Sequence, residues 1–181
     1  KGYLSGHLQP VNGLNGATPK GTLTLVESTL YGYTSAGGKH GKGVIFMLDH
    51  NGKDFKTVYD FTDGSDNETG NEPHHDAMYF YKDHLYGAAL YGGEKNNGVI
   101  FRINPDGSGY SPLHVFNGSD TDGAQPHSGI IVINNVFYGL TAQGGIGRKG
   151  TLYRMNPDGT DFSVLYSFSK GTGHNPHGRL T

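Results

Sequence analysis

Short runs in which hydrophobic and polar residues alternate, separated by glycine-rich turns, recur along the whole chain. In one such run, apolar Phe101 and Ile103 alternate with polar Arg102 and Asn104. A period of two residues predicts half-buried β-strands, and no window of the sequence carries a convincing helical period. The pattern therefore predicts an all-β fold.

Five sequence markers return three times in the same order. A Tyr-Gly pair is followed by a Gly-Gly pair, a run of Gly and apolar residues ending in an aromatic, a turn ending in Gly, and an aromatic strand end. In the third repeat these markers predict strands at roughly 128–133, 136–142, 150–155 and 162–168. Four antiparallel strands repeated about every 50 residues are typical of a β-propeller blade.

The repeats divide the chain into successive blades. We expect blades at about 16–69, 70–122 and 123–172, and the start of a fourth at 173–181, whereas residues 1–15 match no unit and are expected to form a partial preceding strand or a cap. Closed propellers have about four to eight blades, so three blades leave two open ends. The chain is then part of a longer array, or it joins other copies in a ring or an open stack.

Composition narrows the function classes further. The 31 glycines and 8 prolines among 181 residues suit a turn-dense fold. The absence of cysteine excludes disulfides, thiol nucleophiles and cysteine-ligated zinc or iron–sulfur sites. A formal net charge of -2 gives no general attraction for nucleic acid, and no apolar run is long enough to predict a membrane span.

Glycines at fixed repeat positions predict local backbone geometry. Gly52, Gly107 and Gly159 each close a turn after Asn or Asp. We expect two-residue type I′ turns here, in which both central residues have positive φ. The glycine after each marker tyrosine is expected to let the innermost strands approach a crowded central axis.

A basic or imidazole side chain follows a proline at one position of every repeat. The residues are Lys20, His74, His127 and His177. Equivalent positions around a pseudo-symmetry axis form a ring, so these side chains are candidates for a ligand-binding site, with metal binding or proton transfer as narrower possibilities. The alternative is that each ring packs on the next strand and bonds a backbone carbonyl.

Acidic residues gather in two equivalent loops. One loop holds Asp63, Asp66 and Glu68, and the other holds Asp120 and Asp122. Oxygen ligands at alternating positions suit Ca²⁺, the one cofactor that the sequence suggests, although neither loop has the EF-hand pattern. The alternative is ordinary solvated turn chemistry.

The order of the markers, closed by an Asp-Gly-x-x-Pro motif, resembles the GloVer-type tandem repeat of bacterial surface proteins with varied anchors. Residues 122–126, Asp-Gly-Ala-Gln-Pro, fit the closing motif best, and the other repeats lack its Asp. The resemblance runs from about residue 16 to the end. It implies a β-propeller in an exported, envelope-associated protein, and it implies no particular chemistry.

Three functions stay open at this point. The first is a non-catalytic, secreted or cell-surface module for binding or self-assembly, whose partners are other copies, further blades of a longer chain, or carbohydrate. The second is a polysaccharide lyase or hydrolase that uses His and Tyr in a propeller funnel, since those residues suit proton abstraction and leaving-group protonation. The third is a structural subunit of an extracellular filament.

Overall fold

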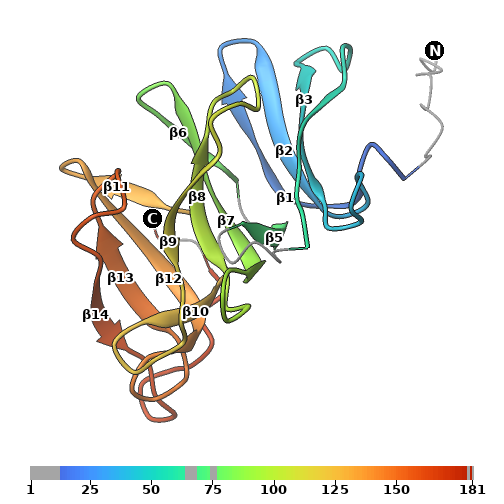
Figure 1. Cartoon of the computed structure of the whole chain (residues 1–181). Helices are drawn as coiled ribbons and strands as arrows, with labels where there is room; N and C mark the ends of the chain where they lie inside the picture. Colours follow the sequence, from blue (N-terminus) through green and yellow to red (C-terminus); the bar gives the residue numbers. More distant parts are fainter. Residues whose placement is uncertain (1–12, 64–68, 74–76, 179, 181) are drawn as a thin grey trace, which may run out of the picture.

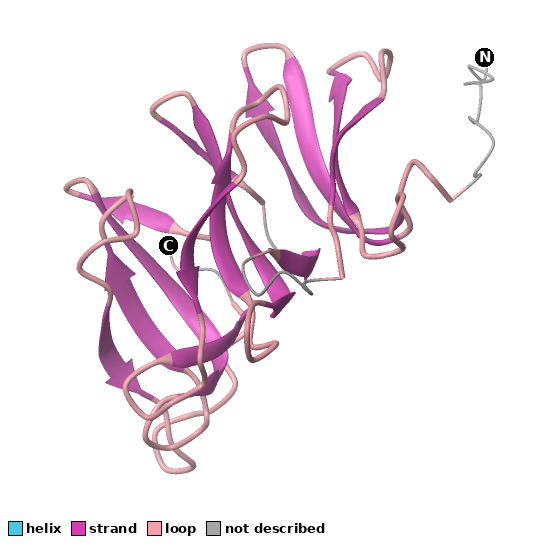
Figure 2. Ribbon diagram, viewed as in Figure 1, coloured by secondary structure: helices cyan, strands magenta, loops and turns pink. Residues whose placement is uncertain are grey.

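Three separate antiparallel sheets make up the structure, a computed structural model that describes residues 13–63, 69–73, 77–178 and 180. Within this part of the chain there are strands and connecting loops and no helix (Figures 1 and 2). The all-β prediction is confirmed. No described segment therefore forms a helix that is long and apolar enough to span a membrane.

The first sheet is a meander of four strands. Its order is β1 (Ala17–Val26), β2 (Thr29–Ala36), β3 (Val44–Asp49) and β4 (Lys56–Asp60). Each strand pairs with the next one in the chain, and all of these pairs are antiparallel. Short connections between sequential strands give this order directly.

The second sheet has the same order with a divided first strand. It consists of β5 (Gly70–Pro73), β6 (Tyr79–Tyr81), β7 (His84–Gly92), β8 (Val99–Ile103) and β9 (Ser111–Val115). Both β5 and β6 pair with β7, at opposite ends of that longer strand. In the first sheet β1 fills both places as one strand, with a shift in register between Lys20 and Thr24.

The third sheet repeats the second. It consists of β10 (Gly123–Pro126), β11 (Ile131–Ile133), β12 (Val136–Gly144), β13 (Thr151–Met155) and β14 (Ser163–Ser167). Strands β11 to β14 lie where the sequence predicts them. Strand β10 lies within the closing motif, before the first strand that the sequence predicts at 128–133, and it pairs with the far end of β12.

The glycine after each marker tyrosine has a different role from the one expected. Gly87 lies on β7, the second strand of its sheet, directly opposite Phe101 on β8. A Cβ on Gly87 would collide with the Tyr33 hydroxyl of the preceding blade and would lie 2.7 Å from the Phe101 ring. The glycine therefore makes room for these two aromatic side chains rather than for a strand at a central axis.

The hairpin turns before the outermost strands also differ from the expectation. In the second sheet the Gly107 N–H donates to the Asn104 carbonyl at 2.9 Å, and the Asn104 N–H donates to the Ser108 carbonyl at 2.9 Å. Only Gly107 has positive φ, at 89°; Asp106 does not. This is a type I turn followed by a left-handed glycine, because Pro105 has the fixed φ that suits the second position of a type I turn.

The hydrophobic core lies between the sheets, which pack face to face. One cluster joins the first and second sheets, and a second cluster joins the second and third. The first includes Tyr31, Ile45, Phe61, Met78, Leu85, Phe101 and Ile103; the second includes Tyr86, Ile100, Phe116, Ile130, Phe137, Tyr153 and Met155. The three sheets thus stack as consecutive blades, fanned side by side as Figure 1 shows.

Two equivalent turn glycines provide a test of this stacking. Gly52 and Gly107 both have positive φ, at 79° and 89°. A Cβ on Gly107 would collide with the backbone carbonyl of Val58 in the preceding blade, whereas a Cβ on Gly52 meets nothing within 4 Å. We expect Gly52→Ala to cost about 1–2 kcal/mol from handedness alone, and Gly107→Ala to cost clearly more. Urea unfolding of both variants measures the difference, and equal losses would contradict the packing of this turn on the preceding blade.

Candidate functional site

A backbone hydrogen bond links each unit to the one before it. The donor is the N–H of the residue before the repeat proline. The acceptor is a carbonyl in the preceding unit, on the residue before the glycine that leads into the third strand. The three bonds are Glu72 to Lys42 at 3.0 Å, Gln125 to Asn97 at 2.7 Å and Asn175 to Lys149 at 2.7 Å. We call this contact the blade-linking hydrogen bond.

The geometry around this bond is the same in each repeat. Glu72, Gln125 and Asn175 all have positive φ, at 53°, 56° and 51°, and Thr18 at the equivalent position has 58°. The following proline packs against the leading glycine of the previous unit; a Cβ on Gly150 would lie 2.7 Å from Cδ of Pro176. Residues 173–178 therefore contact the third sheet as the start of a further blade would.

Aromatic stacking joins the outer parts of neighbouring blades. Tyr59 of β4 stacks on Tyr110 of the second unit, with ring centroids 4.8 Å apart and planes 5° apart. His114 of β9 stacks in the same way on Phe162 of the third unit, at 3.6 Å and 8°. Tyr59, His114 and Tyr166 share one repeat position, and Phe55, Tyr110 and Phe162 share another. Each joint thus pairs one member of each set.

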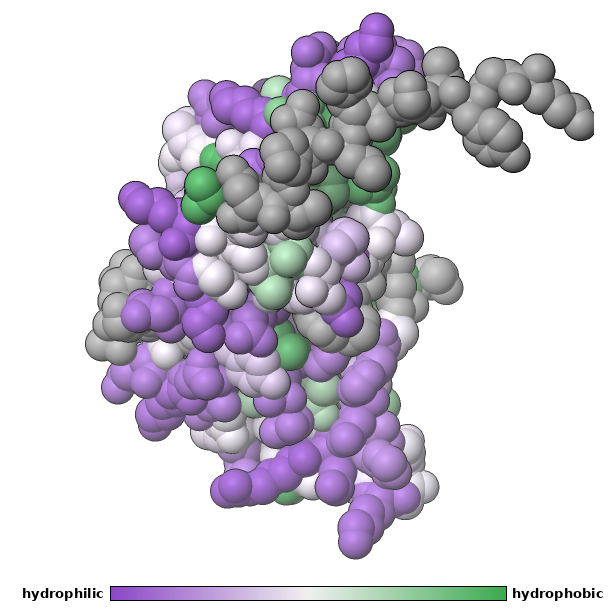
Figure 3. All heavy atoms as spheres, turned by 90° about the vertical axis from the view of Figure 1, so that its right-hand side faces the viewer, coloured by the Kyte–Doolittle hydropathy of each residue, from purple (hydrophilic) through white to green (hydrophobic). Residues whose placement is uncertain are grey.

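The first sheet carries an exposed copy of the surface that the other sheets bury. This N-terminal end face consists of Leu23, Leu30, Phe46, Leu48 and Phe55. Leu23 is 49% exposed, whereas the equivalent Met78 and Ile130 are 3% and 2% exposed. Phe55 stacks on Phe46 within its own sheet and is 40% exposed. Figure 3 looks onto this side of the molecule, where hydrophobic side chains reach the surface beside hydrophilic loops.

The outward face of the third sheet is equivalent to the faces that the first and second sheets bury against the next sheet. This C-terminal end face consists of Tyr138, Leu152, Tyr166 and Phe168, which are half-buried or exposed, whereas the equivalent Tyr86, Ile100 and Phe116 are buried. Tyr166 makes an edge contact with Phe168 and is 43% exposed. A groove of about 690 Å³ runs along β14, lined in part by Ile146, Leu165 and Tyr166.

The structure brings together two of the four residues predicted to form a ligand-binding ring. The rings of His127 and His177 are stacked, 4.3 Å between centroids and 6° between planes; His127 is buried and His177 is exposed. Lys20 is half-buried on β1, and His74 lies outside the described residues. Imidazole lone pairs lie in the ring plane, so a parallel pair packs face to face and does not converge on one ion.

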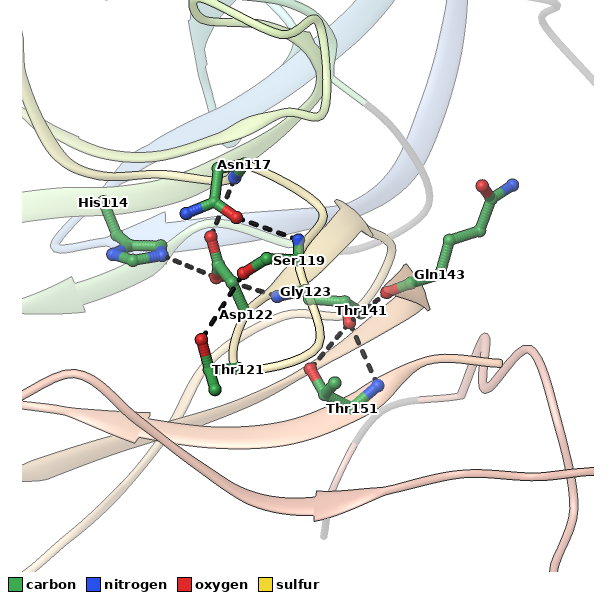
Figure 4. Close-up of polar contacts among 9 residues, drawn as sticks. All are labelled: His114, Asn117, Ser119, Thr121, Asp122, Gly123, Thr141, Gln143 and Thr151. Carbon is green, nitrogen blue, oxygen red and sulfur yellow. Dashed lines mark hydrogen bonds and ion pairs between the residues drawn. The ribbon is translucent and has the colours of Figure 1, made fainter. Parts of the chain in front are cut away.

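The acidic loop of the second unit is organised by Asp122 (Figure 4). Its Oδ1 lies 3.0 Å from His114 Nε2 and accepts the Gly123 N–H at 2.7 Å, and its Oδ2 accepts the Asn117 N–H at 2.7 Å. Asp122 is buried. Both carboxylate oxygens thus hold the loop between β9 and β10.

The remaining predicted calcium ligands are less constrained. Asp63 and Asp120 are exposed, and Asp66 and Glu68 lie outside the described residues. Thr69 replaces the buried aspartate in the first acidic loop, where its hydroxyl lies 2.6 Å from that of Thr62. Over the described ranges no three His, Cys, Asp or Glu side chains come close enough to hold a metal ion. The calcium site stays a prediction.

The marker tyrosines are packing residues. Burial is the main cause that raises the pKa of Tyr31 and of Tyr86 above the ordinary value, and the carboxylate of Asp106 in the next blade adds to the effect at Tyr31. Both phenols stay protonated near neutral pH, so neither is suited to act as a general base.

A comparison of the sequence with protein families agrees with the repeat pattern and the three stacked sheets. The model of the Gloeobacter/Verrucomicrobia repeat matches residues 3–181. The chain belongs to the Gloeobacter/Verrucomicrobia repeat family. The GloVer-type resemblance is thereby confirmed. No curated protein matches this Gloeobacter/Verrucomicrobia repeat chain significantly.

Solved structures share the fold of this Gloeobacter/Verrucomicrobia repeat chain. It is similar to a chain of the nidogen/laminin complex (12% identity, 82% of this chain and 47% of that chain, TM-score 0.51) and to TolB from Agrobacterium tumefaciens (12%, 82% and 48%, TM-score 0.50). It is also similar to Zg3597, a family 117 glycoside hydrolase of the marine bacterium Zobellia galactanivorans (11%, 88% and 58%, TM-score 0.55). The propeller-like fold is confirmed, and the chain spans about half the length of the first two structures.

Substitution of Asp122 and of its exposed neighbour Asp120 distinguishes a structural role of the acidic loop from calcium binding. Asp122→Ala leaves the buried N–H of Gly123 and the N–H of Asn117 without their acceptor, and we expect it to lower the free energy of unfolding by about 2–3 kcal/mol. Asp120→Ala is the control and should change it by less than about 0.5 kcal/mol. Both are measured by urea unfolding with EDTA and with Ca²⁺. If the Asp122→Ala loss occurs only when Ca²⁺ is present, the hydrogen-bond explanation is wrong.

Proposed function

We propose that this chain is a non-catalytic assembly module, a run of propeller blades whose two end faces dock further blades of the same repeat. One observation carries the proposal: residue types that are buried in the internal joints are half-buried or exposed at the two ends. Contiguous exposed apolar surface on a protein marks an interaction site. Here the internal joints indicate what covers it.

The energetics of the internal joints support docking at the ends. Burying one large apolar side chain is worth about 1.5–3 kcal/mol. Each end face offers several such side chains, among them Leu23 and Phe55 on one side and Tyr166 and Phe168 on the other. A fitting blade would bury them together, as the two internal joints bury their equivalents.

The contacts of residues 173–178 support the same proposal. Asn175 and Pro176 contact the third sheet through the blade-linking hydrogen bond and the proline–glycine contact. In the second and third units the equivalent residues lie in β5 and β10, each of which pairs with a long second strand. A blade that begins at residue 173 needs the corresponding strands from a longer array or from another copy.

The proposal includes the setting that the GloVer resemblance implies. The module then works in a secreted or cell-surface protein, where it spaces or closes an extracellular array. Carbohydrate stays a predicted partner of its exposed loops. In this proposal neither the stacked pair His127 and His177 nor the buried marker tyrosines carry out a reaction.

Adding a blade tests the proposal. A second copy of residues 123–172 is inserted between Thr172 and Gly173, so that its first strand meets the C-terminal end face. Because repeat proteins gain stability from each nearest-neighbour interface, we expect one cooperative transition with a melting temperature raised by about 5 °C or more. The melting temperature is measured by circular dichroism. A separate transition for the added unit, with no gain for the rest, would contradict the proposal.

A matched control lies within the extended chain. Tyr166→Ala in the first copy of residues 123–172 affects the new joint, and it should remove part of the gain. The same change in the inserted copy affects only the new end face, and it should leave the melting temperature within about 1 °C. Equal effects from the two positions would show that the added blade does not cover Tyr166.

A further inference from the structure

The two end faces of this chain fit each other by the rules of its own internal joints. In the two joints the outer-strand rings Tyr59 and His114 stack on Tyr110 and Phe162. The end faces keep one member of each set, Tyr166 on the third blade and Phe55 on the first, which are 43% and 40% exposed. The rest of each face has the same residue types as the corresponding buried face.

The backbone offers one partner of the blade-linking hydrogen bond at each end of the chain, the acceptor on the third blade and the donor on the first. Lys149 has the acceptor carbonyl of the blade-linking hydrogen bond, as Lys42 and Asn97 do in the preceding blades. Thr18 on the first blade has φ 58°, the left-handed conformation shared by the donors Glu72 and Gln125. An incoming first blade would therefore present Thr18 N–H to the Lys149 carbonyl.

Within one chain the Lys149 carbonyl already accepts the N–H of Asn175. Residues 173–178 are exposed except for half-buried Pro176, and the contacts that hold them are the Lys149 hydrogen bond, the packing of Pro176 on Gly150 and the stacking of His177 on His127. A second copy and this segment would use the same acceptor. The segment thus competes with a docking blade.

Closure limits the number of copies. A contact between two different faces generates either a closed ring or an open fibre. Propellers close with about four to eight blades, so two copies of three blades give six, whereas three copies exceed the range.

We propose that a second copy of this chain docks head to tail, with Phe55 of each copy stacked on Tyr166 of the other, and that two copies close one six-bladed ring. The inference rests on the proposed function, because it names the partner of the same end faces. It adds that residues 173–178 oppose this docking by holding the Lys149 carbonyl.

Sedimentation equilibrium of the full chain over a range of concentrations tests the proposal. We expect a single step from one copy to two. Phe55→Ala and Tyr166→Ala should each weaken association at least about tenfold, because a symmetric ring loses two stacks at once. The double variant should weaken it little further, since both changes remove the same contact. Phe80→Ala is the control: this exposed aromatic lies on the second blade, away from both end faces, and the change should leave association unaltered.

Asn175→Pro gives an effect of opposite sign. Proline has no N–H and cannot adopt positive φ, so the substitution releases the segment from Lys149. We expect association to become several-fold tighter with no loss of folded structure in circular dichroism. A substitution that merely damaged the third blade would weaken association instead.

Several results would overturn the inference. One is that both the parent chain and the Asn175→Pro variant are strictly monomeric. Another is that Phe55→Ala and Tyr166→Ala do not change association. The third is assembly beyond two copies into an open fibre. If such a result appears while the inserted fourth blade still stabilises the chain, the inference fails and the proposed function stands. If the inserted blade also fails to stabilise, the proposed function fails as well.

Discussion

Face-to-face packing of one sheet on the next is the interaction on which the rest of this structure depends. Each sheet has only four or five strands and carries apolar residues on both faces, so it cannot bury its hydrophobic side chains alone. The two core clusters accordingly lie between sheets. The closing motif, the turn glycines Gly107 and Gly159 and the outer-strand aromatics lie where one blade meets another.

Much of this architecture follows from sequence patterns. The repeated markers predict the number of blades and the positions of β11 to β14, because strand alternation and turn chemistry are local signals. Strand β10 escapes prediction, since Gly123–Pro126 is short and contains a proline, features that argue for a loop. The turn at Gly107 is misjudged because Asp-Gly fits type I′, although Pro105 has the fixed φ that suits the second position of a type I turn.

The candidate site is harder to predict for a physical reason. Leu23 and Met78 are the same kind of residue at the same repeat position, and only the presence of a preceding blade separates exposed from buried. That difference depends on the place of a unit in the array, which local sequence does not record. The repeat histidines could be predicted in part. Their shared repeat position predicts that His127 and His177 lie together, but the parallel stacking of their rings depends on side-chain rotamers, which the repeat pattern does not fix.

The aromatic contacts between blades also bear on how such a chain folds. Tyr59 and Tyr110, or His114 and Phe162, are about one repeat apart in sequence, and each of the two core clusters joins only adjacent sheets. Relative contact order therefore falls as units are added, and the search for native contacts does not lengthen with the array. Folding that starts at any one joint can spread to its neighbours. Only the closing contact of a ring would join distant parts of a chain, and it would form last.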